Sequence, residues 1–318
     1  MLKRRLLLAA SAGLALPAVA RAATRTIGWL SPESRETMAP FFEALHAGLR
    51  DNQKGEEIRI VERYAPKGPD DIVAGVADLE RQGVALIVTQ GAATPPAVRA
   101  ARKVPIVFGY SGDPVVGGLV QSLARPGGSA TGMTFMSIEL MAKRIDFLRM
   151  AVPASRRVAL LSNANHPGEE REIAACKSVL ERSGVELTVH RIKSAEEIAP
   201  AVDGALQDAQ ALLVLPSGTM VRAAPAMAAQ CLVRKTPLVS GWASFAQAGG
   251  LMTYGPNFEA VYRRLGSYVV RVLDGTAPGD LPIEQPTSFE LVLNRRTATA
   301  IGVRLPQTLV AQAEEIIE

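Results

Sequence analysis

Short apolar runs alternate along this chain with longer amphipathic stretches. Apolar runs bounded by turn residues predict buried strands, and the amphipathic stretches have the length and spacing of helices. Phe42, Leu45 and Leu49, for example, recur at the spacing of one helix face. This alternation is typical of an α/β fold, in which mainly parallel sheets are covered by helices on both faces.

The first half of the pattern predicts strands at Thr26–Leu30, Ile58–Arg63, Leu86–Thr89 and Ile106–Phe108, and helices near Ala39–Asp51, Pro69–Gln82, Pro95–Arg102 and Pro114–Leu123. A helix over Ile138–Ala151 leads into the second half. That half predicts strands near Arg157–Leu161, Glu186–Arg191, Ala211–Leu215, Leu238–Ser240 and Gly250–Thr253, and helices near Gly168–Ser183, Ala195–Ala209, Val221–Arg234 and Ala243–Ala246. The tail predicts a helix at Phe258–Asp274, a proline-rich crossing, a strand at Phe289–Leu293 and two short helices.

The two halves repeat one unit in the same order, at an offset of roughly 130 residues. ALIV at Ala85–Val88 returns as ALLV at Ala211–Val214, and KVPIV at Lys103–Val107 returns as KTPLV at Lys235–Val239. We therefore predict two similar doubly wound parallel-sheet lobes joined by a hinge, with a ligand-binding cleft between them. Lobe 1 is expected to comprise residues 23–130 plus 254–286, and lobe 2 residues 131–253 plus 287–318.

The first 22 residues have the order of an export signal. Lys3, Arg4 and Arg5 form a basic segment, an apolar stretch follows, and Ala20-Arg21-Ala22 is an A-x-A cleavage site. The sequence predicts cleavage after Ala22 and a periplasmic product that is not embedded in the membrane. Arg4-Arg5 leaves both the general secretory route and the twin-arginine route open.

Removal of this signal changes the charge of the chain. The whole sequence has 35 basic and 31 acidic residues, and four of the basic ones lie in the signal, which leaves a balanced mature chain. Such a balance gives no reason to expect nucleic acid as a partner. Cys176 and Cys231 both fall on predicted helices, and the sequence leaves open whether they are free buried thiols or a disulfide.

No catalytic, cofactor-binding or metal-binding motif stands out. The histidines His46, His166 and His190 lack the spacing of metal ligands, and only His166 is expected near the cleft. Asp113-Pro114 fits the N-cap and first residue of a helix, and the segment Arg125–Gly128 fits a turn and not a phosphate loop. We therefore expect a binding protein without cofactor or metal, and not an enzyme.

Ligands of open parallel sheets bind outside the carboxyl ends of the strands, so the residues at those ends are the candidate ligand contacts. Hydroxyl groups and exposed backbone N–H groups there suit an anionic ligand end, and aromatic side chains from opposite lobes suit a planar ligand body. Glu33, Thr219 and Ser244 also fall at strand ends. The predicted ligand-binding residues are Trp29, Ser31, Gln90, Gly91, Ala92, Thr94, Tyr110, Ser111, Ser162, Asn163, Ser217, Gly218, Trp242 and Tyr254.

Three long segments carry a resemblance to a known family. VPIVFGYSGDPVVGGLVQSLARPGGSATG at Val104–Gly132, AGGLMTYG at Ala248–Gly255 and the stretch Leu281–Glu318 resemble the type I periplasmic substrate-binding proteins of ABC transporters, a family that includes tryptophan- and tyrosine-type binding proteins. The resemblance covers essentially the whole mature chain. It implies a hinged, two-lobed receptor that carries a small ligand to an ABC permease and its ATPase.

One departure from this family bears on the ligand. In tryptophan-type members an Asp follows the Pro-Ser/Thr pair, and this chain has Gly218 there, after Pro216-Ser217. The sequence thus predicts a small organic acid, in particular an aromatic carboxylate, in preference to an amino acid or a sugar. Two alternatives stay open: a periplasmic receptor for a membrane sensor, and an enzyme that uses Glu33, Asp113 and His166 in the same cleft.

Overall fold

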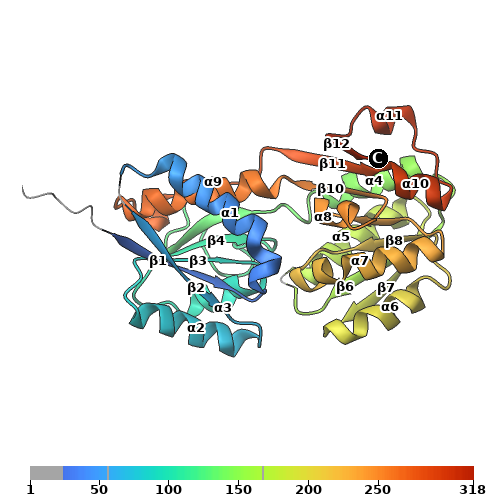
Figure 1. Cartoon of the computed structure of the whole chain (residues 1–318). Coiled ribbons are helices and arrows are strands. Elements are labelled where there is room, and N and C mark those ends of the chain that lie inside the picture. The colour runs from blue at the N-terminus through green and yellow to red at the C-terminus, as the bar shows by residue number, and fades with distance from the viewer. Residues whose placement is uncertain (1–23, 56, 167) are drawn as a thin grey trace, which may run out of the picture.

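The computed structural model describes residues 24–55, 57–166 and 168–318, so the predicted signal peptide and its cleavage site lie outside the described residues. Two sheets form two lobes that lie side by side (Figure 1). The first sheet has the strand order β2-β1-β3-β4-β5, and the second has the order β12-β11-β10-β9-β8-β6-β7. The shared order of the first four strands in each lobe, second-first-third-fourth, confirms the internal repeat and the doubly wound fold.

Lobe 1 is built around the five-stranded sheet. Its strands are β1 (Arg25–Ser31), β2 (Ile58–Tyr64), β3 (Ile87–Gln90), β4 (Ile106–Tyr110) and β5 (Ala130–Thr134), all parallel. Its helices are α1 (Arg35–Asn52), α2 (Pro69–Arg81), α3 (Thr94–Ala100) and α9 (Phe258–Leu273), with short 3-10 turns η1 (Gly91–Ala93) and η3 (Pro278–Asp280).

Side chains of lobe 1 alternate between two cores, one on each face of the sheet. Ile27 and Trp29 of β1 pack toward α1 and α9, whereas Leu30 packs toward α2 and α3. Helices α1 and α9 approach closely, because a Cβ at Gly48 would overlap the backbone carbonyl of Arg263. Glycine is therefore required for this contact.

Lobe 2 is built around the seven-stranded sheet. Its strands are β6 (Arg157–Asn163), β7 (Glu186–Ile192), β8 (Ala211–Val214), β9 (Leu238–Ser240), β10 (Met252–Pro256), β11 (Phe289–Asn294) and β12 (Glu315–Ile317), and the β10–β11 pair alone is antiparallel among them. Its helices are α4 (Met141–Ala151), α5 (Glu169–Arg182), α6 (Ile198–Ala205), α7 (Gly218–Val233), α8 (Ala243–Gln247), α10 (Arg295–Ile301) and α11 (Gln307–Val310), and 3-10 turn η2 (Ala195–Glu197) precedes α6. Cys176 and Cys231 are free and buried, each in a different core of this lobe.

Within the part of the chain that the structure describes, three segments cross between the lobes: from β5 to α4, from β10 to α9, and from η3 to β11 (Figure 1). The expected lobe boundaries at 130/131 and 253/254 fall inside β5 and β10. Residues 131–134 belong to the first sheet, and residues 254–256 belong to the second.

The helix predicted over Pro114–Leu123 is absent; the segment forms turns. The Asp113 carboxylate does accept the N–H groups of Val115 and Val116, as an N-cap would. Gly117 and Gly118 follow at once, and Gly118 adopts φ of 66°. Two consecutive glycines end the turn before a helix can propagate.

Candidate functional site

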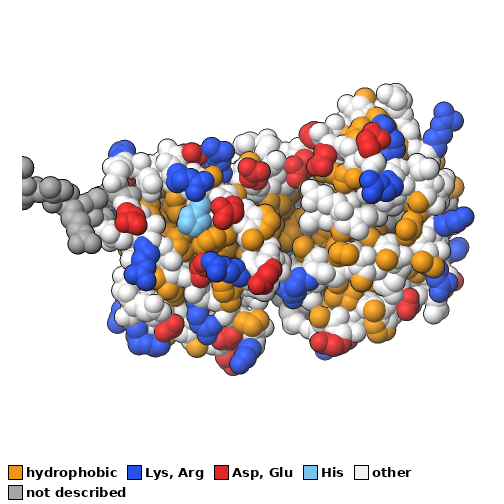
Figure 2. All heavy atoms as spheres, in the orientation of Figure 1, with side chains coloured by type: hydrophobic (Ala, Val, Ile, Leu, Met, Phe, Trp, Pro, Cys, Tyr) orange, Lys and Arg blue, Asp and Glu red, His pale blue; other side chains and the backbone are white. Residues whose placement is uncertain are grey.

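A cleft of about 490 Å³ lies between the lobes, at the carboxyl ends of strands from both sheets. The surface is hollowed where the two halves meet, and hydrophobic side chains border this hollow (Figure 2). The cleft thus occupies the position that the strand topology predicts for a ligand.

Lobe 1 lines the cleft with loops that follow β1, β2, β3, β4 and β5. Gly91 directly follows β3 and adopts φ of 53°, and Gly68 before α2 adopts φ of 97°. Both conformations favour glycine and bring backbone close to the cleft. The lobe 1 residues that line it are Pro32, Glu33, Pro66, Gly68, Pro69, Ile72, Gln90, Gly91, Ala92, Ser111 and Phe135.

Lobe 2 lines the cleft with loops that follow β6, β7, β8 and β9. Ser217 is the N-cap of α7, where its side-chain oxygen accepts the N–H of Met220. Trp242 packs against Phe258 across the hinge and, although only partly buried, contacts the cores of both lobes. The lobe 2 residues that line the cleft are Asn163, Asn165, His166, Lys193, Ser194, Ala195, Ser217, Gly218, Thr219, Arg222 and Trp242.

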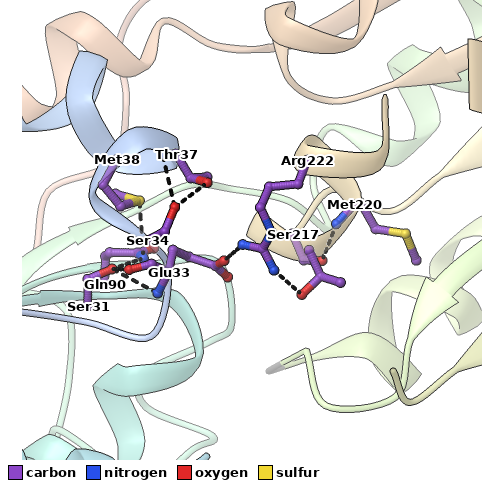
Figure 3. Close-up of polar contacts among 10 residues, drawn as sticks. Ser31, Glu33, Ser34, Thr37, Met38, Gln90, Ser217, Met220 and Arg222 are labelled. Carbon is purple, nitrogen blue, oxygen red and sulfur yellow. Dashed lines mark hydrogen bonds and ion pairs between the residues drawn. The ribbon is translucent and has the colours of Figure 1, made fainter. Parts of the chain in front are cut away.

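Of the described residues that line the cleft, three have side chains with a formal charge: Glu33, Lys193 and Arg222. Glu33 lies in the loop after β1 and Arg222 on α7, and the two side chains point toward one another across the cleft and form an ion pair (Figure 3). Among the described residues, Lys193 has no carboxylate partner for its ammonium group. The lining therefore carries one more positive than negative charge, which favours an anionic ligand group.

His166 connects the cleft to a buried carboxylate. Its Nε2 lies 3.2 Å from Oε1 of Glu172, a residue with no exposed surface. The other carboxylate oxygen of Glu172 has no hydrogen-bond partner among the described residues. A buried carboxylate needs compensation, so His166 is held in the cleft wall by its contact with Glu172.

A second ion pair joins the lobes through Asp113 and Arg171, whose Nη1 lies 3.1 Å from Oδ2 of Asp113. Burial alone would raise the pKa of Asp113, but hydrogen bonds from Val116, Val115 and Arg171 hold it below its usual value. In both interlobe pairs the acid comes from lobe 1 and the arginine from lobe 2.

The structure brings eight of the predicted ligand-binding residues to the cleft. They are Gln90, Gly91, Ala92, Ser111, Asn163, Ser217, Gly218 and Trp242.

Four aromatic residues, Trp29, Tyr110, Trp242 and Tyr254, were predicted to contact the ligand, and the prediction is wrong for all of them except Trp242. Trp29 faces the core of lobe 1, with its ring 5.4 Å from that of Phe42. Tyr110 is buried beside Phe108, and Tyr254 packs 5.1 Å from the ring of Phe147. The carboxyl end of a strand fixes the edge of the sheet, but the alternation of side chains decides which face each one covers.

Three predicted hydroxyl residues lie behind the cleft surface. Ser31 is buried, and its hydroxyl oxygen accepts the N–H of Glu33 at 3.0 Å. Ser162 donates to Glu169 at 2.6 Å within lobe 2. Thr94 is buried at the start of α3, and its hydroxyl has no partner among the described residues. Ser31 therefore positions a cleft residue and does not line the cleft itself.

Sequence reasoning missed the cleft residues that follow the outer strands. Pro66 and Gly68 follow β2, Lys193 and Ser194 follow β7, and Phe135 follows β5. The strand-end rule applies equally to β2 and β7, which were both predicted, so extending it to them would have identified the residues that follow them. Phe135 was not accessible to this rule, because strand β5 was not predicted. Arg222 was also missed. It lies one helical turn after Gly218, and this spacing places the two residues on the same face of the helix, so Arg222 could have been predicted to lie beside Gly218.

The side chain of Glu33 lies against Gly218, and this contact bears on the ligand prediction. A Cβ at Gly218 would overlap the carboxylate of Glu33, so the space expected for a side chain at 218 holds a carboxylate from the opposite lobe. Gly218 replaces the Asp of tryptophan-type members, but the Glu33 carboxylate supplies a negative charge at the same place.

Within residues 24–55, 57–166 and 168–318, no group of three or more His, Cys, Asp or Glu side chains is arranged to hold a metal ion. None of the helices in that part of the chain combines the length and hydropathy of a bilayer-spanning segment.

Residues 31–317 match the family of ABC transporter substrate binding proteins, and the chain belongs to this family. A tyrosine-binding protein of Clostridioides difficile (strain R20291) is 22% identical over 209 residues, which are 65% of this chain and 60% of that relative. The match thus spans less than two thirds of the relative's length.

Solved structures share the fold. An ABC domain from Streptococcus pneumonia in complex with L-Trp aligns with a TM-score of 0.85 at 20% identity, covering 93% of this chain and all of the other. The ligand-free, open form of a Clostridium difficile substrate binding protein with adhesive properties aligns with a TM-score of 0.68 at 18% identity, covering 92% of this chain and 99% of the other. Family and fold are those of substrate-binding proteins and not of enzymes.

Proposed function

We propose that this protein captures a small organic ligand between its two lobes and delivers it to an ABC permease and its ATPase. The observation that carries the proposal is the cleft of about 490 Å³ lined by strand-end loops of both lobes. A cavity of this size suits a small molecule. Because the walls belong to different lobes, a ligand that contacts both favours the closed arrangement.

The ligand is a small molecule with a carboxylate and a planar or apolar body. Arg222 and Lys193 supply positive charge, and a guanidinium group can bind a carboxylate through two parallel hydrogen bonds. Trp242 and Phe135 supply apolar walls. The tyrosine-binding relative and the L-Trp complex of the structural neighbour are consistent with an aromatic molecule that carries a carboxylate.

The protein acts in the periplasm after removal of an export signal. The support is the order of basic segment, apolar stretch and A-x-A site before Ala23. Sequencing of the amino terminus of protein recovered from the periplasm is expected to begin at Ala23. Recovery of the chain from the cytoplasm with Met1 retained would contradict export.

A thermal-shift screen of aromatic carboxylates, amino acids and sugars tests the binding proposal. A true ligand at 100 times its dissociation constant adds about 2.7 kcal/mol to the stability of the folded state. X-ray scattering in the presence of that ligand should show the closed arrangement of the lobes. If no compound of the panel stabilises the protein, the solute-binding proposal is wrong.

Trp242 provides a direct readout of the cleft. In a Trp29→Phe background Trp242 is the sole tryptophan, and ligand is expected to change its emission. Trp242→Ala should weaken binding at least tenfold, or about 1.4 kcal/mol. Trp29→Phe, which alters a side chain outside the cleft, is the matched control and should leave affinity unchanged.

A further inference from the structure

The start of α7 gives the lobe 2 wall a position suited to a negative charge. Ser217 caps the helix, and Arg222 lies one turn later, where its Nη2 is 3.5 Å from the hydroxyl of Thr219. The amino terminus of a helix favours an anion, and a guanidinium group beside it adds a full positive charge. Arg222 is 45% exposed, so its charge is accessible to a molecule in the cleft.

This position is occupied by a carboxylate of the protein itself. Glu33 reaches from lobe 1 and forms an ion pair with Arg222, and its own side chain is only 14% exposed (Figure 3). The approach depends on Gly218, because a Cβ there would overlap the Glu33 carboxylate.

The backbone that carries Glu33 is fixed within lobe 1. Its N–H donates to the hydroxyl oxygen of Ser31 at 3.0 Å, and the Nε2 of Gln90 donates to the same oxygen at 3.4 Å. The loop therefore presents the carboxylate to lobe 2 in a defined position. Withdrawal of Glu33 requires either rotation of its side chain or separation of the lobes.

We propose that Glu33 is a built-in competitor of the ligand: its carboxylate occupies the place on Arg222 that the ligand carboxylate takes. This proposal rests on the proposed function, in which Arg222 binds a ligand carboxylate. The Glu33–Arg222 pair ties lobe 1 to lobe 2, and a ligand must displace Glu33 to reach the guanidinium group. Apparent affinity falls in proportion to the fraction of molecules in which Arg222 is available.

Glu33→Gln tests this role, because it keeps the size of the side chain and removes its charge. The probe is 3-(4-hydroxyphenyl)propionate, an aromatic carboxylate without an amino group, and binding is measured by titration calorimetry. E33Q should bind it at least tenfold more tightly than wild type. Arg222→Met should bind it at least tenfold more weakly than wild type. Asp113→Asn, which breaks the other interlobe ion pair without touching Arg222, should stay within about twofold of wild type, less than 0.5 kcal/mol.

A second measurement needs no ligand. Spin labels on cysteines at the exposed positions Val73 and Val233 report the distance between α2 and α7, and the native cysteines are buried. E33Q and R222M should each shift this distance toward longer values without added ligand. The double variant should shift it no further, because both changes break one contact.

Several results would overturn the proposal. Unchanged binding of the carboxylate by E33Q would show that Glu33 does not compete with the ligand. Weaker binding by E33Q would show that Glu33 contacts the ligand. An unchanged distance in E33Q would show that the pair does not hold the lobes. If E33Q binds no carboxylate at all, the proposal that Glu33 competes with the ligand is wrong. The proposed solute-binding function would still hold if a sugar or tyramine binds and closes the lobes. The proposed function itself fails if wild type binds no compound of the thermal-shift panel.

Discussion

Arg144 lies fully buried at the hinge, where a guanidinium group joins three parts of the chain. It is on α4, its Nε donates to the carbonyl of Tyr254 at 2.7 Å, and its Nη1 donates to the carbonyl of Ser137 at 3.2 Å. Ser137 belongs to the first crossing between the lobes, and Tyr254 lies in β10 just before the second. Arg144 thus fixes two of the three crossings relative to lobe 2.

Arg144→Met is predicted to destabilise the protein by about 3–5 kcal/mol. Each hydrogen bond from a charged donor contributes about 1.5–3 kcal/mol, and both carbonyls would be left buried without this donor. Burial lowers the pKa of Arg144 to about 10, and Glu172 opposes that decrease, so the group stays charged at neutral pH. Its removal also leaves the buried Glu172 carboxylate without that nearby positive charge.

Urea unfolding followed by circular dichroism measures this loss. Arg149→Met is the matched control, since Arg149 is exposed on the same helix, and it should change the free energy of unfolding by about 0.5 kcal/mol or less. Arg144→Lys should retain part of the stability, because an ammonium group keeps the charge but lacks the forked geometry. A loss below about 1 kcal/mol for R144M would show that the stability of the hinge does not depend on these bonds.

Three further predictions concern the packing and titration of single residues. Gly48→Ala should cost about 1–3 kcal/mol of unfolding free energy, because its Cβ would overlap the Arg263 carbonyl between α1 and α9. Burial raises the pKa of both Cys176 and Cys231 to about 12, so a disulfide reagent at pH 8 should modify them only after unfolding. Hydrogen bonds from Arg264 hold the pKa of Glu284 below its usual value. The stability from Glu284 is therefore present above about pH 4.5 and lost as pH falls through its folded pKa, and Glu284→Gln should reduce the acid-induced decrease in melting temperature.

The elements that carry a strong local pattern were predictable, and those that depend on tertiary contacts were not. Apolar runs such as Ala211–Val214 identified the buried strands of both lobes. Strand β5 was missed because its sequence, ATGMT, lacks a run of β-branched or aromatic residues. It forms through pairing with β4, where a Cβ at Gly132 would overlap the Phe108 carbonyl. Such a contact has no counterpart in local sequence.

The location of the candidate site could be predicted from the sequence, but many of the side chains that line it could not. Strand ends located the cleft, and Gln90 and Ser217 line it as expected. The wrong predictions of ligand contacts arose from side-chain direction. Trp29, for example, lies at the carboxyl end of β1, but its side chain faces α1 and α9 and not the cleft. The approach of Glu33 to Gly218 joins residues from different lobes, and only the packing of the two lobes brings them together.

The contacts between the lobes differ in burial, and this difference indicates where the molecule opens. At the hinge, Arg144 is buried, and Trp242 and Phe258 pack with ring centres 4.8 Å apart. Across the cleft, the Asp113–Arg171 pair is a third to a half exposed, and exposed ion pairs contribute only about 0–1 kcal/mol. Separation of the lobes would therefore break the ion pairs across the cleft and keep the hinge contacts. Because Glu33 is less exposed than Asp113, the Glu33–Arg222 pair contributes more to holding the cleft closed.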